Sequence, residues 1–261
     1  MAQRDIIRSE AVVLRGLDYG ETSQIVTLFT REKGKIGVMA KGARRPKTPF
    51  GATLQPMAYS EVVFYYKPTR TLQILSESSH VESFHRLREN LERIMVGLRI
   101  VELVDALMEE EDPQPTVFAL LVRLLRRLND TDRRAANLWP YAQLRLARLL
   151  GIAPSIERAN VEAVGDEGLL SKANGGVYPA DAAPAAPRRA SRQALRAYAV
   201  FAKADLDTAM RMELTPELRR EVEALVRDFL RYHVEEAYPD RSEAVIAQLT
   251  RQSPTRSAAS S

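Results

Sequence analysis

The chain has 261 residues, a formal net charge of +4 and no cysteine, which excludes disulfide bonds, thiolate-bound zinc and a cysteine nucleophile. Hydrophobic residues make up 45% of the sequence, enough for a buried core. Because no apolar run reaches the roughly 18 residues of a membrane span and no export signal opens the chain, we expect a cytoplasmic protein.

The positive charge is concentrated in the first third of the chain. Residues 1–80 carry 12 Lys or Arg against 7 Asp or Glu, whereas the rest carries 26 against 27. Between positions 31 and 47, a single acid, Glu32, accompanies seven bases: Arg31, Lys33, Lys35, Lys41, Arg44, Arg45 and Lys47. Such a local excess indicates a polyanionic partner that contacts one part of the molecule.

Five short segments within residues 1–80 have the composition of β-strands. They are rich in β-branched and aromatic residues, are separated by glycine- or proline-bearing turns, and cover residues 11–14, 24–30, 35–40, 60–66 and 71–75. The connections are too short for crossover helices, which predicts a mainly antiparallel sheet. Closure into a five-stranded barrel removes the edges that an open sheet would expose.

After about residue 80 the hydrophobic period becomes helical. We predict helices over residues 84–107, 116–129, 133–150, 189–212, with a break near Asp205, and 216–238. Residues 165–189, rich in glycine and proline, are expected to form an irregular insertion, and residues 251–261 a disordered tail. The predicted domains are therefore 1–80 and 81–250, followed by this tail.

The seven bases are candidate phosphate ligands. Nucleic-acid backbones require several cations on a surface without competing acids, although a charged loop can also serve solubility alone. Bases of single strands stack on exposed rings, but burial in the barrel core is the commoner fate for each aromatic residue of this region. These aromatics are Tyr19, Phe29, Phe50, Tyr59, Phe64, Tyr65 and Tyr66.

The sequence predicts no catalytic residue, metal site or cofactor. Its three histidines have no metal-ligand spacing, and it contains no phosphate-binding glycine motif. The acidic residues 109–112 could hold a divalent ion, as in a metal-dependent nuclease, but such a run at a helix end is usually solvated.

The segment 19–35, the Lys41-Gly-Ala-Arg44 core and the following Phe50-Gly and Leu54-Gln-Pro resemble the RecO family of bacterial recombination and repair mediators. The similarity is dense over residues 8–80 and looser at residues 229–233 and 241–242. It implies an α+β fold in which an N-terminal five-stranded OB-fold barrel precedes an all-α helical domain. The family's basic DNA surface corresponds to Lys33, Lys35, Lys41, Arg44, Arg45 and Lys47.

The resemblance also implies a function. RecO proteins bind single- and double-stranded DNA without sequence preference and anneal complementary strands in the bacterial nucleoid. In the RecF pathway they act with RecR to load the recombinase on DNA coated by single-strand-binding protein (SSB), without enzymatic activity. Many members hold zinc with four cysteines near residues 172–189, which this chain lacks, so no metal is expected there.

The acidic C-terminal tail of SSB requires an apolar groove rimmed by arginine. Candidates for this rim lie on the predicted helices: Arg123, Arg126, Arg127, Arg145, Arg148, Arg227 and Arg231. An alternative of another class is a protein-interaction adaptor whose basic loop binds an acidic protein and contacts DNA only incidentally.

Overall fold

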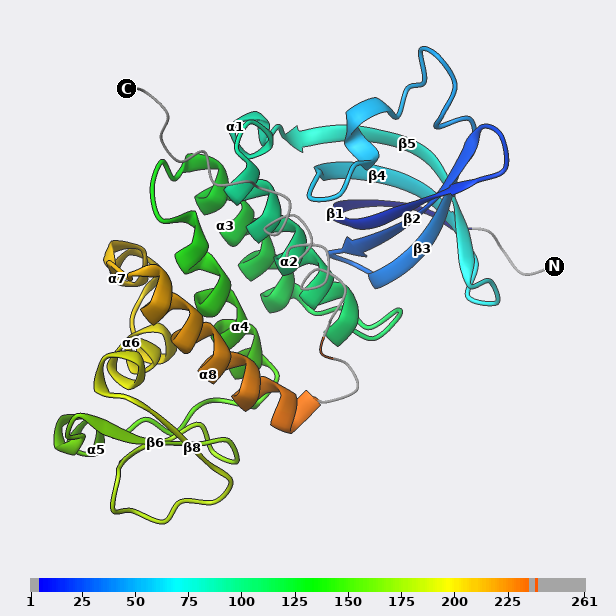
Figure 1. Cartoon of the computed structure of the whole chain (residues 1–261). Coiled ribbons are helices and arrows are strands. Elements are labelled where there is room, and N and C mark those ends of the chain that lie inside the picture. The colour runs from blue at the N-terminus through cyan, green and yellow to red at the C-terminus, as the bar shows by residue number, and fades with distance from the viewer. Residues whose placement is uncertain (1–4, 235–237, 239–261) are drawn as a thin grey trace, which may run out of the picture.

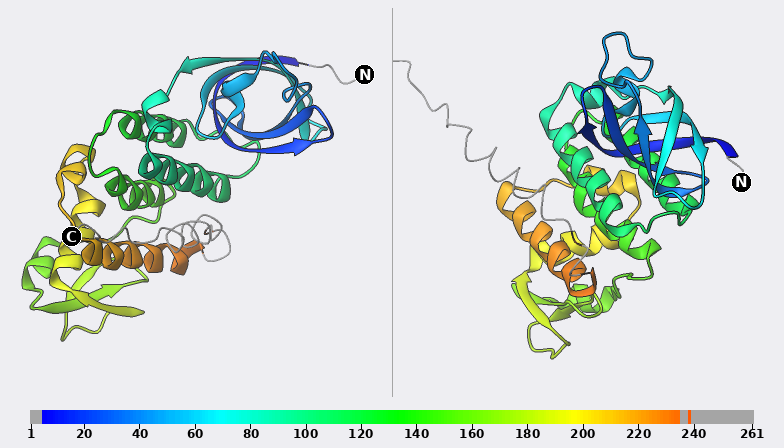
Figure 2. Two further views of the ribbon diagram at one scale, coloured as in Figure 1. Left: turned by 45° about the horizontal axis from the view of Figure 1, so that its top comes forward. Right: turned by 90° about the vertical axis from the view of Figure 1, so that its right-hand side faces the viewer.

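The computed structural model describes residues 5–234 and Tyr238, and it places a β-barrel beside a helical domain (Figure 1). In Figure 2 (left), which looks into the barrel from one end, the strands form a closed ring. The strands are β1 Asp5–Tyr19, β2 Ser23–Thr30, β3 Gly34–Ala40, β4 Tyr59–Tyr66 and β5 Leu72–Glu82. A short 3₁₀ helix, Gly51–Leu54, lies in the connection from β3 to β4.

The barrel closes in the order β1-β2-β3-β5-β4, and β1 pairs antiparallel with both β2 and β4. This five-stranded closed sheet is of the OB type, so the predicted fold of the N-terminal domain is confirmed. β1 is longer than predicted because a register shift between Val13 and Arg15 bends it, which lets its two halves pair with different neighbours. β3 and β5, by contrast, pair in parallel over only three residues, Gly37–Met39 with Leu72–Ile74.

The helical domain follows β5 directly. Its helices are α1 His85–Arg88, α2 Leu91–Leu107, α3 Pro115–Asp130, α4 Leu138–Leu149, α5 Arg158–Ala163, α6 Arg192–Lys203, α7 Leu206–Arg211 and α8 Pro216–Val234. The predicted break near Asp205 is confirmed, because its carboxylate caps α7 by accepting from the Thr208 N–H at 2.8 Å. No helix within residues 5–234 is long and apolar enough to cross a membrane.

The expectation of an irregular insertion over residues 165–189 is wrong, and the otherwise helical domain includes a small sheet there. This segment contains a three-stranded sheet in the order β7-β6-β8, built from Glu167–Ser171, Val177–Pro179 and Pro187–Ser191. Its inner side chains, including Leu170 and Val177, are fully buried in the helical core. Burial and strand pairing therefore order this segment, which composition alone could not reveal. The predicted tail, residues 251–261, lies outside the described residues.

The two domains meet along an apolar and aromatic surface. The outer face of β1 and β2 packs against α2 and α3, and the ring of Phe118 lies 6.0 Å from that of Phe29 and 6.3 Å from that of Tyr59. A second contact is made by the segment that follows α2. The Glu111 N–H donates to the Lys35 carbonyl at 2.9 Å, so this segment extends the edge of β3 where β5 has not yet begun.

Gly34 allows this close approach. Its φ is +64°, and a Cβ at this position would lie 2.1 Å from the Asp112 carbonyl oxygen. Gly20 also has a positive φ, +58°, but no described atom lies within 4 Å of a Cβ placed there. A comparison of the two positions therefore distinguishes the cost of a strained φ from the cost of a steric clash.

We predict that Gly34→Ala lowers the free energy of unfolding more than Gly20→Ala. The strained φ costs about 1–2 kcal/mol at either site, and at Gly34 the clash adds at least about 2 kcal/mol by breaking the contact between the Glu111 N–H and β3. Urea unfolding of both variants measures the difference, and hydrogen exchange at Glu111 reports the broken contact. Equal losses of stability would contradict the prediction.

Candidate nucleic-acid interface

The seven predicted bases occupy two ends of the barrel. β3 spans seven residues, about 20 Å at roughly 3.3 Å per residue, and it separates the β2–β3 turn from the loop that follows it. Arg31, Lys33 and Lys35 lie at the end next to the helical domain, whereas the other four lie in the loop that projects at the top of Figure 1. The single cluster in the sequence is therefore two groups in space.

Lys35 is part of the domain junction. Its Nζ donates to the Asp105 carbonyl at 2.6 Å and lies 3.9 Å from the Asp105 carboxylate, and its side chain is only 15% exposed. Arg15 Nε lies 2.9 Å from the same carboxylate. Two cations thus hold one acid of α2 against the barrel, and Lys35 is not free to bind phosphate.

Arg31 and Lys33 are also engaged within the molecule. An Arg31 nitrogen lies 3.5 Å from the Glu10 carboxylate, and Lys33 Nζ lies 4.6 Å from the centroid of the Tyr66 ring. The Tyr66 hydroxyl donates to Glu111 at 3.0 Å. Burial, this hydrogen bond and the adjacent charge raise the pKa of Tyr66. The bases at this end are therefore largely compensated.

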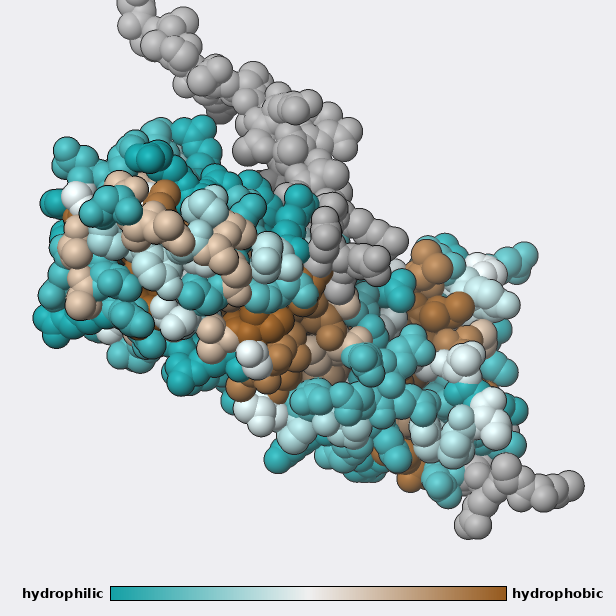
Figure 3. Space-filling model, turned by 90° about the horizontal axis from the view of Figure 1, so that it is seen from below, coloured by the Kyte–Doolittle hydropathy of each residue, from teal (hydrophilic) through white to brown (hydrophobic). Residues whose placement is uncertain are grey.

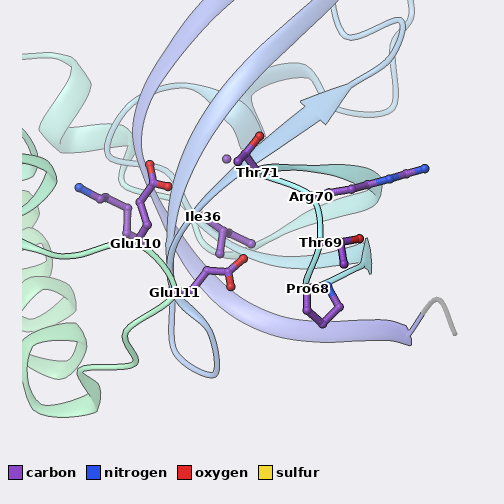
Figure 4. Close-up of a pocket in the computed structure, with 9 residues that line it drawn as sticks. Ile36, Pro68, Thr69, Arg70, Thr71, Glu110 and Glu111 are labelled. Atoms are coloured by element: carbon purple, nitrogen blue, oxygen red, sulfur yellow. The ribbon is translucent and has the colours of Figure 1, made fainter. Parts of the chain in front are cut away.

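A cavity of about 320 Å³ at the same end has an acidic wall (Figure 4). It lies between the β3 edge and the β4–β5 turn; Glu110 and Glu111 form one side, and Arg70 extends away from them. Carboxylates at this position disfavour phosphate. Within residues 5–234 no group of three His, Asp or Glu side chains is placed to hold a metal ion.

The loop end of the barrel is electrostatically different. Lys41, Arg45 and Lys47 are exposed and form no ion pair with a described residue. Arg44 is 38% exposed and anchors the loop, since it donates to the Gly20 carbonyl at 3.0 Å and lies 3.3 Å from Asp18. The loop therefore carries three cations without an ion pair to a described residue, and a fourth, Arg44, holds it in place.

Most of the aromatic residues are buried, as expected for a small barrel. Phe29, Phe50, Tyr59, Phe64 and Tyr66 are less than 9% exposed. Burial and a hydrogen bond to Glu10 raise the pKa of Tyr59 to about 12, which keeps this phenol neutral at the domain junction. Tyr19, in contrast, is 53% exposed beside the basic loop, and Tyr65 is partly exposed on the outside of the barrel.

A second cavity, of about 430 Å³, lies between α3 and α4 of the helical domain. Three of the seven predicted arginines line it together with apolar side chains: Arg123, Arg145 and Arg148, beside Leu120, Tyr141 and Leu149. Arg126 and Arg127 lie elsewhere and pair with Glu82 and Asp207, at 2.7 and 3.2 Å. Arg227 and Arg231 are on α8 and do not line this cavity.

The sequence prediction named only the arginines of this cavity, although its lining residues recur at helical intervals in the sequence. Thr116, Leu120 and Arg123 follow one face of α3 at intervals of four and three residues. Tyr141, Arg145 and Arg148 repeat the same intervals on α4. What the sequence cannot reveal is that these two faces meet.

The fold thus defines a two-domain α+β protein in which an OB-type barrel precedes a helical domain. The family model described as "Recombination protein O N terminal" matches residues 1–84, and "Recombination protein O C terminal" matches residues 88–242. The chain is 73% identical to the DNA repair protein RecO of Salinibacter ruber over 98% of both chains. It is 28% identical to that of Chlorobium limicola over 94% of this chain and 98% of the relative, and 36% identical to that of Bacillus subtilis over 58% of each. The chain belongs to the RecO family of DNA repair and recombination proteins.

We predict that Lys35→Met lowers the free energy of unfolding, whereas Lys47→Met leaves it nearly unchanged. Loss of the Lys35 ammonium leaves part of Asp105 without its donor, which lowers the free energy of unfolding by about 1–3 kcal/mol. Lys47 is exposed and unpaired with any described residue, so its replacement changes stability by less than about 0.5 kcal/mol. Urea unfolding of the two variants measures both effects, and a stable Lys35→Met protein would contradict the assignment.

Proposed function

We propose that this protein is a non-enzymatic recombination mediator of bacterial DNA repair, acting at the nucleoid in the cytoplasm. It binds single- and double-stranded DNA without sequence preference and anneals complementary strands. With RecR, in the RecF pathway, it helps to load the recombinase on DNA coated by SSB. The observation that carries the proposal is the group of free cations on the loop end of the barrel: Lys41, Arg45 and Lys47.

Charge is the physical basis of the proposed annealing. Two DNA strands repel each other through their phosphates, and cations that neutralise these phosphates lower the barrier by releasing counterions. Contacts to phosphates carry no sequence information, which supports binding without sequence preference. This mechanism requires no bond to be made or broken, and therefore no catalytic group or cofactor.

The bases at the other end of the barrel contribute less to this binding. Arg31 and Lys33 lie beside acids or an aromatic ring, and Lys35 is bound to Asp105. The proposed DNA interface is therefore smaller than the seven residues of the sequence prediction, with its centre on the loop 41–47.

The cavity between α3 and α4 is the proposed site for the C-terminal tail of SSB. Leu120 and Leu149 offer apolar contact for the end of the tail, and Arg123 and Arg148 are exposed at the rim, where they can bind its carboxylates. Arg145 is held against the ring of Tyr141, 4.9 Å from its centroid, and contributes mainly to the wall.

The first test removes the three free cations with Lys41→Gln, Arg45→Gln and Lys47→Gln together. Each phosphate contact on a single strand contributes about 0.7 to the slope of log affinity against log salt, so the triple variant should lose about 2 from this slope. Fluorescence anisotropy with labelled oligonucleotides at several salt concentrations measures it. The matched control removes three exposed bases of the helical domain: Arg133, Arg196 and Lys203.

An equal loss of slope in the control would indicate diffuse attraction instead of a site. If the triple variant keeps its DNA affinity but no longer binds RecR or SSB, the protein is the adaptor of the alternative hypothesis. Cleavage of labelled DNA in the presence of Mg²⁺ or Mn²⁺ would contradict the non-enzymatic mechanism.

The second test concerns the cavity of the helical domain. Arg123→Glu should lower the affinity for a peptide with the acidic SSB tail by about tenfold or more, because a charge-assisted contact becomes a repulsion. Isothermal titration calorimetry measures this affinity, and Arg133→Glu on the surface outside the cavity is the control. Equal effects of both substitutions would exclude the cavity as the tail site.

A further inference from the structure

One side of α2 carries apolar side chains that belong to neither hydrophobic core. Leu91, Met95 and Leu98 follow one another at intervals of four and three residues, so they share one face of the helix. Leu91 and Leu98 are 65% and 39% exposed, and Met95 is half-buried. None of the three packs into the helical core or the barrel interior. We call these three residues the α2 stripe.

The barrel and α8 flank the α2 stripe on its two sides. Asp105 follows Leu98 by seven residues on the same side of α2, and its carboxylate lies 2.9 Å from Arg15 Nε of the barrel. Arg99, four residues after Met95, lies 3.5 Å from the Glu223 carboxylate of α8. Figure 1 and Figure 2 (left) accordingly show α2 running between the barrel and α8.

Exposure alone does not identify what covers an apolar face. Figure 3 shows hydrophobic side chains gathered on the helical domain, in the middle of the view, and on the barrel, at its right. The α2 stripe is distinguished by the course of the chain, because the last described residue lies near it.

This last described residue, Tyr238, is held against α4. It is 6% exposed, and its hydroxyl accepts a hydrogen bond from Gln143 Nε2 at 3.1 Å. Four residues earlier on α4, the ring centroid of Trp139 lies 4.2 Å from Arg99 Cζ of α2. Four residues are about one helical turn, or about 5.4 Å. The chain therefore continues from a point about one turn of α4 away from the contact between α4 and α2.

The sequence after Tyr238 has the pattern of a short amphipathic helix. Asp240 precedes Glu243 by three residues, directly before a hydrophobic run, which is the signature of a helix N-terminus. Within a helix over residues 241–250, the large apolar side chains share one face: Val245, Ile246 and Leu249. A helix of this length is marginal in water by itself, so it requires an apolar surface on which to pack.

The segment 241–250 and the α2 stripe match in length and in charge. At 1.5 Å per residue the segment extends over about 15 Å, and the stripe over about 10 Å. Bases flank the segment at positions 241 and 251, and acids lie at the two ends of the stripe at positions 92 and 102. In an antiparallel arrangement each base lies near one acid, and the dipoles of the two helices oppose each other.

We propose that residues 241–250 form a helix that packs antiparallel on the α2 stripe, between the barrel and α8. In this arrangement Ile246 packs against Leu98, and Leu249 packs against Met95. The C-terminal segment of the chain thus covers the apolar face of α2, and the surface is not a site for another protein. This inference goes beyond the proposed function, because it does not depend on the binding of DNA.

Disulfide trapping tests the arrangement directly, since the chain contains no cysteine of its own. The full chain carries Leu98→Cys with Ile246→Cys, and the matched control carries Ile6→Cys with Ile246→Cys. Ile6 is 68% exposed and lies about 20 Å along β1 from Val12, which packs in the helical core. In a glutathione buffer the first pair should form its intramolecular disulfide with an equilibrium constant at least about tenfold larger, because packing holds the two thiols together.

Cleavage by trypsin after Arg241 is a second measurement on the full chain. Leu91→Ser with Leu98→Ser should accelerate this cleavage about tenfold, because the segment loses apolar contact and leaves the stripe more often. Ile246→Ser with Leu249→Ser should have the same effect, and the two pairs combined should add little. The control, Ile6→Ser with Leu17→Ser, removes exposed apolar side chains outside the stripe and should leave the rate unchanged.

Three outcomes would overturn the proposal. The two cysteine pairs form their disulfides equally well, or the serine substitutions on the stripe leave cleavage after Arg241 as slow as in the wild type. In the third, the disulfide of Leu98→Cys with Ile246→Cys forms only between two chains, as a dimer in electrophoresis without reductant, which assigns the α2 stripe to a second copy.

Discussion

The contact between the two domains depends on the short pairing of β3 with β5. Because the parallel contact covers only Gly37–Met39, the first residues of β3 present unpaired backbone groups at a gap in the barrel wall. The segment after α2 fills this gap through the bond from the Glu111 N–H to the Lys35 carbonyl. Gly34 makes the approach possible, so a backbone requirement of the barrel joins the two domains.

The contact between the domains also determines which basic side chains of the barrel remain available to bind an anion. It brings Asp105, Glu110 and Glu111 to one end of the barrel, where they compensate nearby bases and form an acidic cavity wall. At the opposite end Asp18 pairs with Arg44, which holds the loop in place, whereas Lys41, Arg45 and Lys47 form no ion pair with a described residue. One end of the barrel is therefore largely neutralised and the other is basic, which supports the proposed binding of phosphates through counterion release.

The proposed binding surfaces lie on different domains and use different physical interactions. In the proposed function, phosphates would bind the loop 41–47 by charge, and the acidic SSB tail would bind between α3 and α4. Because the two surfaces do not overlap, the proposed function would allow DNA and the SSB tail to be held at the same time.

Local sequence patterns determined the strands, the helices, the break at Asp205 and the absence of thiol chemistry, because periodicity and capping act over a few residues. The family similarity was already carried by residues 8–80. Only the tertiary structure decided that Lys35 is structural and that residues 165–191 contain a sheet. These features depend on contacts between segments far apart in the chain, and seven bases within seventeen positions separate in space because a strand of about 20 Å lies between them.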